Sequence, residues 1–192
     1  MRVTGGSVKG RRLRATRAAS MRPTTDTARR TMFDILGARP RGAVVLDLFA
    51  GAGTLGIEAL SRGAREATFV EKDREACGII ARNLDLAGFS GVGLIKRADV
   101  VRFLSGTPET AFDLVFLDPP YGRGLPFVAR VLQALLQGEW VRPGGTVVVE
   151  AETGPLSVPP GLSEIRTRRF GRTQLVVTER DAATDSDLPG DV

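Results

Sequence analysis

Short apolar runs alternate with amphipathic segments between residues 44 and 150. The apolar runs predict buried strands at residues 44–49, 68–71, 92–96, 112–117 and 146–150. Apolar residues at helical spacing predict helices at residues 54–62, 74–86 and 100–104, and a fourth helix that contains Val128, Val131, Leu132 and Leu135. Strands that alternate with helices need crossover connections, so the pattern predicts an α/β fold with a mainly parallel sheet covered on both faces.

The alternation stops near the C-terminal end of the chain. Residues 165–170 and 174–180 are two extended runs that only Gly171, Arg172 and Thr173 separate, and this spacing predicts an antiparallel hairpin at the sheet edge. Residues 181–192 are polar and acidic and include a proline and a glycine, so we expect a disordered tail.

The N-terminal region has a pattern of its own. Residues 2–14 read as short extended pieces broken by glycines, which predicts a small hairpin or an arm. Behind it, residues 24–26 offer N-cap side chains for a helix that Gly37 ends. The apolar stripe of this helix contains Ala28, Met32, Ile35 and Leu36.

The net charge of +5 is distributed unevenly along the chain. Residues 1–41 carry eleven basic and two acidic side chains, residues 42–180 carry sixteen of each, and residues 181–192 carry four acidic ones. We therefore expect a basic N-terminal extension at 1–41, a catalytic domain at 42–180 and an acidic tail. Arginine is suited to forked contacts with phosphate, so the basic extension favours a nucleic-acid partner.

The scarce residue types exclude whole classes of chemistry. The chain has no histidine, which excludes Ser-His-Asp and Cys-His catalytic arrangements and a histidine-ligated metal. Its single cysteine, Cys77, cannot form an internal disulfide, and its place on an apolar helix stripe predicts a core residue. There is no membrane span and no signal peptide in the sequence, so we expect a soluble, cytoplasmic protein. We also expect a monomer without a metal ion.

A glycine motif stands where the first strand turns into its helix. Gly51, Gly53 and Gly56 have the spacing G-x-G-x-x-G, and Glu71 ends the next strand twenty residues after Gly51. Such a loop lets a ligand approach the backbone and the free N–H groups of a helix N-terminus, while the acid can accept hydrogen bonds from ribose hydroxyls. Both NAD(P) and S-adenosylmethionine fit this pattern, and a tight strand-to-helix turn is the structural alternative.

Three features favour S-adenosylmethionine. Asp47 precedes the glycines and suits an ammonium group, which this cofactor carries and a pyrophosphate lacks. Asp99 ends the third strand and can accept a hydrogen bond from the adenine amine, although strand-end acids also cap helices. The chain is also short for a dehydrogenase with a separate substrate domain. Phe49 and Lys72, beside the glycine loop and Glu71, complete the predicted cofactor site.

The second motif, Asp118-Pro119-Pro120-Tyr121, ends the fourth strand. The two prolines remove N–H donors, so the loop presents carbonyl oxygens and a carboxylate, and the aromatic ring can stack on a base. An exocyclic amine is a poor nucleophile because its lone pair is delocalised into the ring. If Asp118 and the Pro119 carbonyl each accept one N–H, the nitrogen is drawn toward tetrahedral geometry, and positioning suffices for direct methyl transfer.

The leader and the two motifs together resemble a known family. Residues 1–13 (MRVTGGSVKGRRL) and 22–33 (RPTTDTARRTMF), with the glycine loop and the Asp-Pro-Pro-Tyr motif, are similar to the bacterial 16S ribosomal RNA guanine-N2 methyltransferases of the RsmD type, which modify guanine 966 of the small subunit. The resemblance covers about residues 1–180. It implies a Rossmann-like class I methyltransferase sheet of seven strands, S-adenosylmethionine as cofactor, and 16S rRNA in the small subunit as substrate.

The resemblance also assigns residues to the site. The glycine loop, Glu71 and Asp99 would hold the cofactor, and residues 118–121 would hold a guanine flipped out of its stack. The basic residues of the extension would contact RNA phosphates: Lys9, Arg11, Arg12, Arg14, Arg17 and Arg22. Arginines of the final hairpin could extend this surface.

Three other functions use parts of the same pattern. A DNA adenine-N6 methyltransferase would carry both motifs, but usually has a target-recognition domain that this chain lacks. A non-catalytic RNA-binding assembly factor would need only the basic extension and the fold, and the complete Asp-Pro-Pro-Tyr motif disfavours it. A nicotinamide-dependent enzyme would not bind S-adenosylmethionine.

Overall fold

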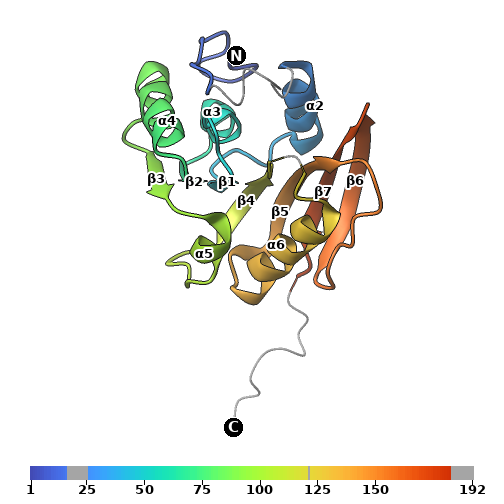
Figure 1. Cartoon of the computed structure of the whole chain (residues 1–192). Coiled ribbons are helices and arrows are strands. Elements are labelled where there is room, and N and C mark those ends of the chain that lie inside the picture. The colour runs from blue at the N-terminus through green and yellow to red at the C-terminus, as the bar shows by residue number, and fades with distance from the viewer. Residues whose placement is uncertain (17–25, 121, 183–192) are drawn as a thin grey trace.

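The computed structural model describes residues 1–16, 26–120 and 122–182. A seven-stranded sheet runs through the molecule, in the order β3-β2-β1-β4-β5-β7-β6 (Figure 1). The strands are β1 (Val44–Leu48), β2 (Glu66–Glu71), β3 (Gly93–Arg97), β4 (Phe112–Leu117), β5 (Val141–Glu152), β6 (Leu162–Phe170) and β7 (Thr173–Arg180). The helices are α2 (Asp26–Leu36), α3 (Thr54–Ser61), α4 (Arg74–Ala87), α5 (Val100–Leu104) and α6 (Leu125–Gln137).

The pairing of the strands confirms the predicted topology. Strands β1 to β5 are parallel to one another, whereas β7 pairs antiparallel with both β5 and β6. The central parallel strands read as apolar runs because helices cover them on both faces, whereas the edge strand β3 is partly exposed. In particular, every residue of β1 is buried.

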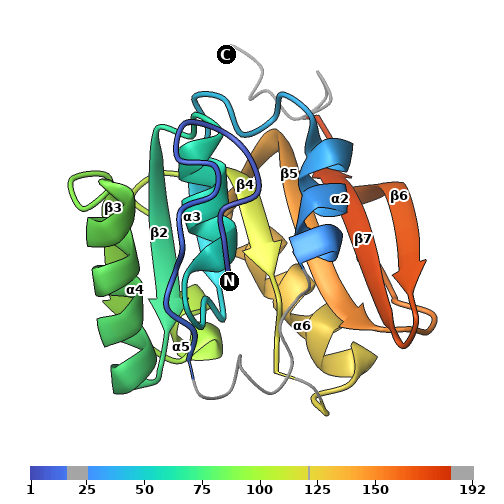
Figure 2. The same ribbon diagram turned by 90° about the horizontal axis from the view of Figure 1, so that it is seen from above.

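Helices cover both faces of the sheet, as the alternation predicted (Figures 1 and 2). Helices α2, α3 and α4 lie on one face, where the rings of Phe33 and Phe116 pack with centroids 5.6 Å apart. Helices α5 and α6 lie on the other face, where Phe103 packs against the buried Trp140 at 4.6 Å. The apolar residues of the sheet are thus divided between two cores.

Two local predictions were wrong. Strand β5 begins at Val141 rather than at residue 146, because the Pro-Gly-Gly segment bulges out of a continuing strand: Val141 pairs with Phe112, and the next pair is Thr146 with Leu114. Cys77 is only partly buried, and its thiol donates to the backbone oxygen of Glu71 (3.4 Å). The buried residues of α4 are Ala76, Ile79, Ile80, Asn83, Leu84 and Ala87, and Cys77 is not among them.

Residues 1–16 form a hairpin that packs along α3. Arg2 and Arg12 pair as an isolated antiparallel bridge, and Val3 and Leu13 are buried in the core on the α2–α4 face. The Ser7 N–H donates to the Ser61 carbonyl at the end of α3 (2.7 Å). The sequence allowed a small hairpin or an arm, and the structure shows a hairpin that packs against α3. The division of the chain into three domains stays an interpretation.

Within the described residues, no helix is both long enough and apolar enough to cross a membrane. The predicted acidic tail lies outside the described residues except for Asp181 and Ala182.

Candidate active site

The loop between β1 and α3 has an unusual backbone. Phe49, Gly51 and Gly53 all have positive φ angles, of 59°, 56° and 75°. Glycine adopts this region without steric cost, but phenylalanine does not, so the conformation of Phe49 is strained. The Phe49 ring packs edge-on against Phe127 of α6 with centroids 6.0 Å apart, which holds the residue in place. Strain of this kind is typical of functional loops.

The three glycines of the loop serve different purposes. A Cβ atom on Gly51 would meet no atom nearer than 3.9 Å, so its backbone borders open space. A Cβ on Gly53 would press on Ile80 at 3.2 Å, and one on Gly56 would overlap the Phe69 ring at 2.3 Å. Gly56 is therefore needed for close packing of α3 on the sheet, and Gly51 is the glycine whose backbone a ligand can approach.

Two acids hold this loop in shape. The buried Asp47 accepts a hydrogen bond from the Gly56 N–H (2.9 Å), and Glu71 accepts from the Gly51 N–H (2.9 Å) and the Asp73 N–H (2.9 Å). The pKa of Asp47 is raised to about 7, mainly by burial and also by the neighbouring charge of Glu71, while the hydrogen bond from Gly56 acts in the opposite direction. The Asp47 carboxylate would thus gain from a cation placed beside it.

Two more residues of the predicted cofactor site follow strand ends: Lys72 follows β2 and Asp99 follows β3. Asp99, which is exposed, caps α5 by accepting from the N–H groups of Val101 (2.9 Å) and Arg102 (3.3 Å). The helix-cap role that the sequence left open is therefore present, and it leaves the second carboxylate oxygen of Asp99 for another donor. Lys72 is exposed beside Glu71.

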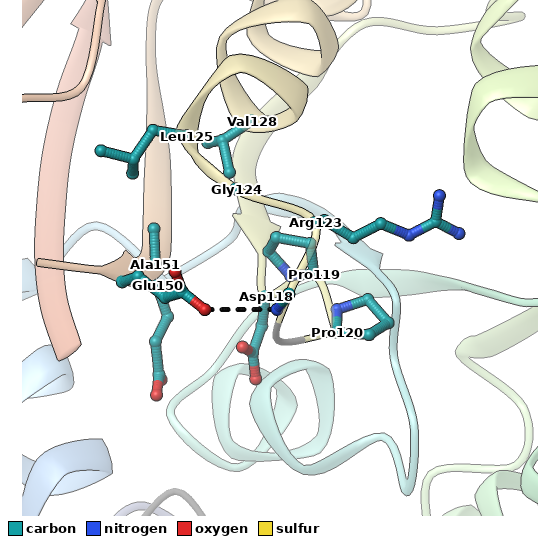
Figure 3. A pocket seen from close by; sticks show the side chains of 11 residues that line it. Asp118, Pro119, Pro120, Arg123, Gly124, Leu125, Val128, Glu150 and Ala151 are labelled. Atoms are coloured by element: carbon teal, nitrogen blue, oxygen red, sulfur yellow. Dashed lines mark hydrogen bonds between the residues drawn. The ribbon is translucent and has the colours of Figure 1, made fainter. Parts of the chain in front are cut away.

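The segment after β4 lines a pocket (Figure 3). Asp118, Pro119 and Pro120 form one side of it, the start of α6 forms another, and the end of β5 closes it. The Gly122 N–H donates to Glu152 Oε1 of β5 (3.2 Å), which ties the loop to the strand. Tyr121 lies outside the described residues, so its predicted stacking role stays a prediction.

Glu150 is a residue of this pocket that the sequence analysis missed. The parallel register pairs Leu117 with Val149, so Asp118 and Glu150 follow side by side, and Figure 3 shows their carboxylates extending in the same direction. Burial raises the pKa of Asp118 well above its ordinary value, and the charges of Glu150 and Asp47 raise it further. The only trace in the sequence was an acid at the end of an apolar run.

The acids of both motifs lie on one face of the sheet. Asp47 pairs in register with Phe69 and Phe116, and those two residues belong to the core under α2, α3 and α4. Because side chains alternate along a strand, the residues two positions further along β2 and beyond β4 point to the same face. They are Glu71 and Asp118. The structure therefore brings the glycine loop and the Asp-Pro-Pro segment together at adjacent strand ends.

Four of the six residues predicted to contact RNA lie in the part of the chain that the structure describes. Lys9, Arg11, Arg12 and Arg14 are exposed on the hairpin, whereas Arg17 and Arg22 lie outside the described residues.

A buried residue that the sequence analysis missed, Asn83 of α4, connects this hairpin to the glycine loop. Its side-chain amide donates to the carbonyls of Ala52 (2.9 Å) and Arg14 (3.0 Å), and its oxygen accepts from the Arg14 N–H (2.8 Å).

The side chains of the described residues include no group of three or more His, Cys, Asp or Glu that could hold a metal ion.

Comparison with known proteins gives consistent matches over most of the chain. The sequence family described as "Conserved hypothetical protein 95" matches residues 1–179. Ribosomal RNA small subunit methyltransferase D of Escherichia coli K12 is 35% identical over 191 residues, which are 97% of this chain and 93% of that protein. Names of this kind recur among the relatives, and they support methylation of ribosomal RNA.

Solved structures agree with the sequence comparison. The structure described as "Putative methyltransferase yhhF from Escherichia coli" superposes with a TM-score of 0.86 at 34% identity, over 95% of this chain and 99% of that chain. The fold is also that of "A putative sam-dependent methyltransferase from Streptococcus mutans", with a TM-score of 0.67 at 10% identity over 78% of this chain and 48% of that one. The predicted class I methyltransferase fold is thereby confirmed.

Proposed function

This chain belongs to the family described as conserved hypothetical protein 95, and from that premise we propose that it transfers a methyl group from S-adenosylmethionine to the N2 amine of a guanine in 16S ribosomal RNA. The observation that carries the proposal is the meeting of two motifs at adjacent strand ends. The glycine loop follows β1 and the Asp-Pro-Pro segment follows β4, and these strands are paired in register. Methyl transfer needs its two reactants in such proximity.

The residues at the end of β1 and β2 fit the cofactor. At Gly51 no atom lies nearer than 3.9 Å to the position a Cβ would occupy, so a ligand can approach the backbone from that side. Asp47 is a buried carboxylate with a raised pKa, and a positive ammonium group would favour its ionised form. Glu71 and Asp99 can accept hydrogen bonds from ribose hydroxyls and from the adenine amine. Phe49, Gly53 and Lys72 border the same loop, and Gly56 packs beneath it. When bound, S-adenosylmethionine supplies an electrophilic methyl group.

The residues after β4 orient the amine that accepts this methyl. Asp118 and the carbonyl of Pro119 each accept one N–H of the guanine N2 amine, which turns the nitrogen lone pair toward the methyl group. As the new C–N bond forms, the bond between the methyl carbon and the sulfonium sulfur would break, and the sulfur would leave as a neutral thioether. The positive charge would pass to the nitrogen, which must then lose one N–H proton. The Asp118 carboxylate balances that charge and accepts the proton before solvent does. No histidine is needed, in agreement with its absence from the chain.

The finer assignments rest on the family resemblance. We propose guanine 966 as the nucleotide and the assembled or assembling small subunit as the substrate. The exposed basic residues of the hairpin would hold the surrounding RNA through its phosphates. The monomeric state and the cytoplasmic location stay predictions.

Transfer of labelled methyl groups tests the proposal. The full chain is incubated with labelled S-adenosylmethionine and, in separate reactions, with small subunits that lack the modification, with naked 16S RNA and with duplex DNA. We expect label in N2-methylguanine from small subunits. Label in N6-methyladenine of DNA would replace the proposal with the DNA alternative, and RNA binding without any transfer would favour the assembly factor. Cofactor binding measured by calorimetry separates both from a nicotinamide-dependent enzyme.

A further inference from the structure

The edge strand β6 carries exposed side chains that the proposed mechanism does not use. Arg166 pairs in register with Val177 of β7. Arg168 pairs with Leu175, and both partners belong to the core under α2, α3 and α4. Residues directly opposite each other on antiparallel strands point to the same face of a sheet. Arg166, Arg168 and, two residues further, Phe170 therefore point to this face, and together they are called the edge row.

A β-bulge decides which side chains form the edge row. The register of β6 with β7 shifts between Glu164 and Arg166, where Ile165 is an extra residue. Without the bulge, the strand would turn Ile165, Thr167 and Arg169 to this face, and the edge row would point to the opposite one. The bulge thus places two cations and an aromatic ring on the same face.

The edge row leads to the end of the sheet where the pocket lies. Strands β4 and β6 run in the same direction, as their arrowheads show in Figure 2, so Phe170 and Asp118 follow the same end of the sheet. Asp118 also points to the face of the edge row, since Phe116, two residues before it, belongs to the same core. Strand β6 is three places from β4, or about 14 Å, which a few nucleotides of single-stranded RNA can span.

Hydrogen bonds hold the turn between β6 and β7 against the segment after β5. The Thr153 N–H donates to the Arg172 carbonyl (2.9 Å). The Gln174 side-chain amide donates to the Gly154 carbonyl (2.8 Å). A Cβ on Gly154 would lie 2.7 Å from Leu125, which lines the pocket. The end of the edge row is therefore fixed relative to the pocket.

The side chains of the edge row suit RNA. Both arginines are exposed, and within the described residues no carboxylate forms an ion pair with either of them. Alternate residues of a strand are about 7 Å apart, close to the distance between successive phosphates of an extended RNA strand. Phe170 is 36% exposed, and an exposed ring beside cations is a platform on which a base can stack. A second copy of the chain would instead bring like charges together.

We propose that the edge row binds the single-stranded RNA next to the target nucleotide, with the two arginines at successive phosphates and the Phe170 ring stacked on a base. This inference rests on the proposed function and adds a second RNA contact to that of the N-terminal hairpin. The hairpin contacts α3 and α4, whereas the edge row is on β6. Flipping a base out of its stack costs free energy, and contacts with the flanking nucleotides offset that cost.

The decisive test compares Arg168→Gln with Arg169→Gln. Both arginines are exposed on β6, but Arg169 pairs with Gln174 and points to the opposite face, so it is a matched control. The affinity of the full chain for naked 16S RNA is measured at several salt concentrations. We expect Arg168→Gln to make the slope of log affinity against log salt shallower by roughly 1, and Arg169→Gln to leave the slope unchanged.

Phe170→Ala tests the stacking contact. We expect the affinity for naked 16S RNA to fall by roughly 5- to 100-fold with an unchanged salt slope, because a stacked ring releases no counterions. Phe170→Trp keeps a ring that can stack and should retain the affinity. On small subunits that lack the modification, Arg168→Gln and Phe170→Ala should raise KM and leave kcat unchanged, because neither side chain touches the reacting amine. Thermal unfolding of each variant checks that the fold is intact.

The outcomes distinguish the two proposals. If the wild-type chain methylates guanine but Arg168→Gln and Arg169→Gln have equal salt slopes, the edge-row inference is overturned and the proposed function stands. Weaker binding to small subunits with unchanged binding to naked RNA would also overturn it, since the partner would then be a ribosomal protein. If the wild-type chain methylates no RNA guanine, the proposed function fails, while the salt slopes still decide whether the edge row binds RNA.

Discussion

Two regions of the molecule contain buried carboxylates, and the surroundings of these carboxylates differ. Beneath the N-terminal hairpin, Glu58 of α3 is fully buried and surrounded by donors: the Thr4 N–H (2.7 Å), the Thr4 hydroxyl (2.8 Å) and Arg62 Nε (2.8 Å), with Arg29 Nε at 3.7 Å. At the end of the sheet, Asp47 and Asp118 lie near other acids, Glu71 and Glu150. Burial raises the pKa of both aspartates.

The difference separates a structural acid from candidate functional ones. The charge of Glu58 is neutralised within the protein, and the same contacts join the hairpin to α2 and α3, since Arg29 also donates to the Arg2 carbonyl (2.6 Å). At the end of the sheet, the charge of Glu71 raises the pKa of Asp47, and the charges of Glu150 and Asp47 raise that of Asp118, so repulsion between these acids reduces stability when they are ionised. Such a cost is maintained where positive or donating groups of a substrate or cofactor relieve it.

The largest effect is expected from removing the structural acid. Glu58→Ala leaves Arg29 buried without its carboxylate, which should lower the free energy of unfolding by about 3 to 5 kcal/mol. Urea denaturation measures this change. The control is Glu66→Ala, whose partner Arg65 is 61% exposed, and it should cost less than about 1 kcal/mol. Equal losses in the two variants would show that the Glu58 network does not hold the hairpin.

For Asp118→Asn we expect a large loss of methyl transfer and no loss of stability. The amide oxygen still accepts a hydrogen bond, but it carries no negative charge and cannot take the proton, so single-turnover methyl transfer should fall by roughly 100- to 1,000-fold. Stability at pH 8 should hold or rise, because the repulsion from Glu150 and Asp47 is removed. Asp85→Asn, on an exposed position of α4, is the control. Wild-type transfer by Asp118→Asn would exclude the carboxylate from the reaction.

Asp47 predicts a pH dependence of stability. Its pKa is about 7 in the folded chain and 3.8 as an ordinary aspartate, so the folded state binds the proton more tightly. Stability from this group is therefore greatest near pH 4 and is lost as the pH rises toward 7. Asp47→Asn removes that loss, so its stability advantage over wild type should grow from near zero at pH 4 to on the order of 4 kcal/mol at pH 8.

Denaturation of wild type and Asp47→Asn at several pH values checks this prediction. Taking the difference between the two proteins cancels the titration of all other groups. An advantage that stays constant with pH would contradict the raised pKa.

The smallest effect concerns the outer side of the hairpin. Arg11 and Arg12 are exposed, so replacing both with alanine should leave the fold and cofactor binding unchanged. If both contact phosphates, the slope of log affinity for RNA against log salt should become shallower by roughly 2. Arg102→Ala with Arg130→Ala, on helices of the opposite face, is the control. An unchanged slope would remove these two arginines from the RNA surface.

Most of the fold could be predicted from the sequence because it depends on local patterns. Parallel strands buried on both faces appear as continuous apolar runs, and amphipathic helices appear between them. The bulge in β5 could not be predicted, because Pro143, Gly144 and Gly145 have the composition of a turn and only pairing with β4 shows that the strand continues. The burial of Arg29 could not be predicted from the sequence either, because the acid it pairs with, Glu58, lies far away in the sequence.

The candidate site was predictable only where it is contiguous. The glycine loop and the Asp-Pro-Pro segment are compact motifs, and the structure brings them to adjacent strand ends. Glu150 and Asn83 belong to no motif, because each gains its meaning from a residue on another element: Asp118 through the strand register, and Ala52 and Arg14 through hydrogen bonds. Long-range pairing of this kind leaves no periodic trace in the sequence.

The strand order leaves β3 and β6 as the two open edges of the sheet. Unpaired N–H and carbonyl groups at an edge can pair with the edge of another copy and start aggregation. Exposed cations occupy both edges, with Lys96 and Arg97 on β3 and Arg166, Arg168 and Arg169 on β6. Two copies approaching edge to edge would bring like charges together. We therefore expect the arginines of the final hairpin to disfavour edge-to-edge pairing of two copies, whether or not they also contact RNA.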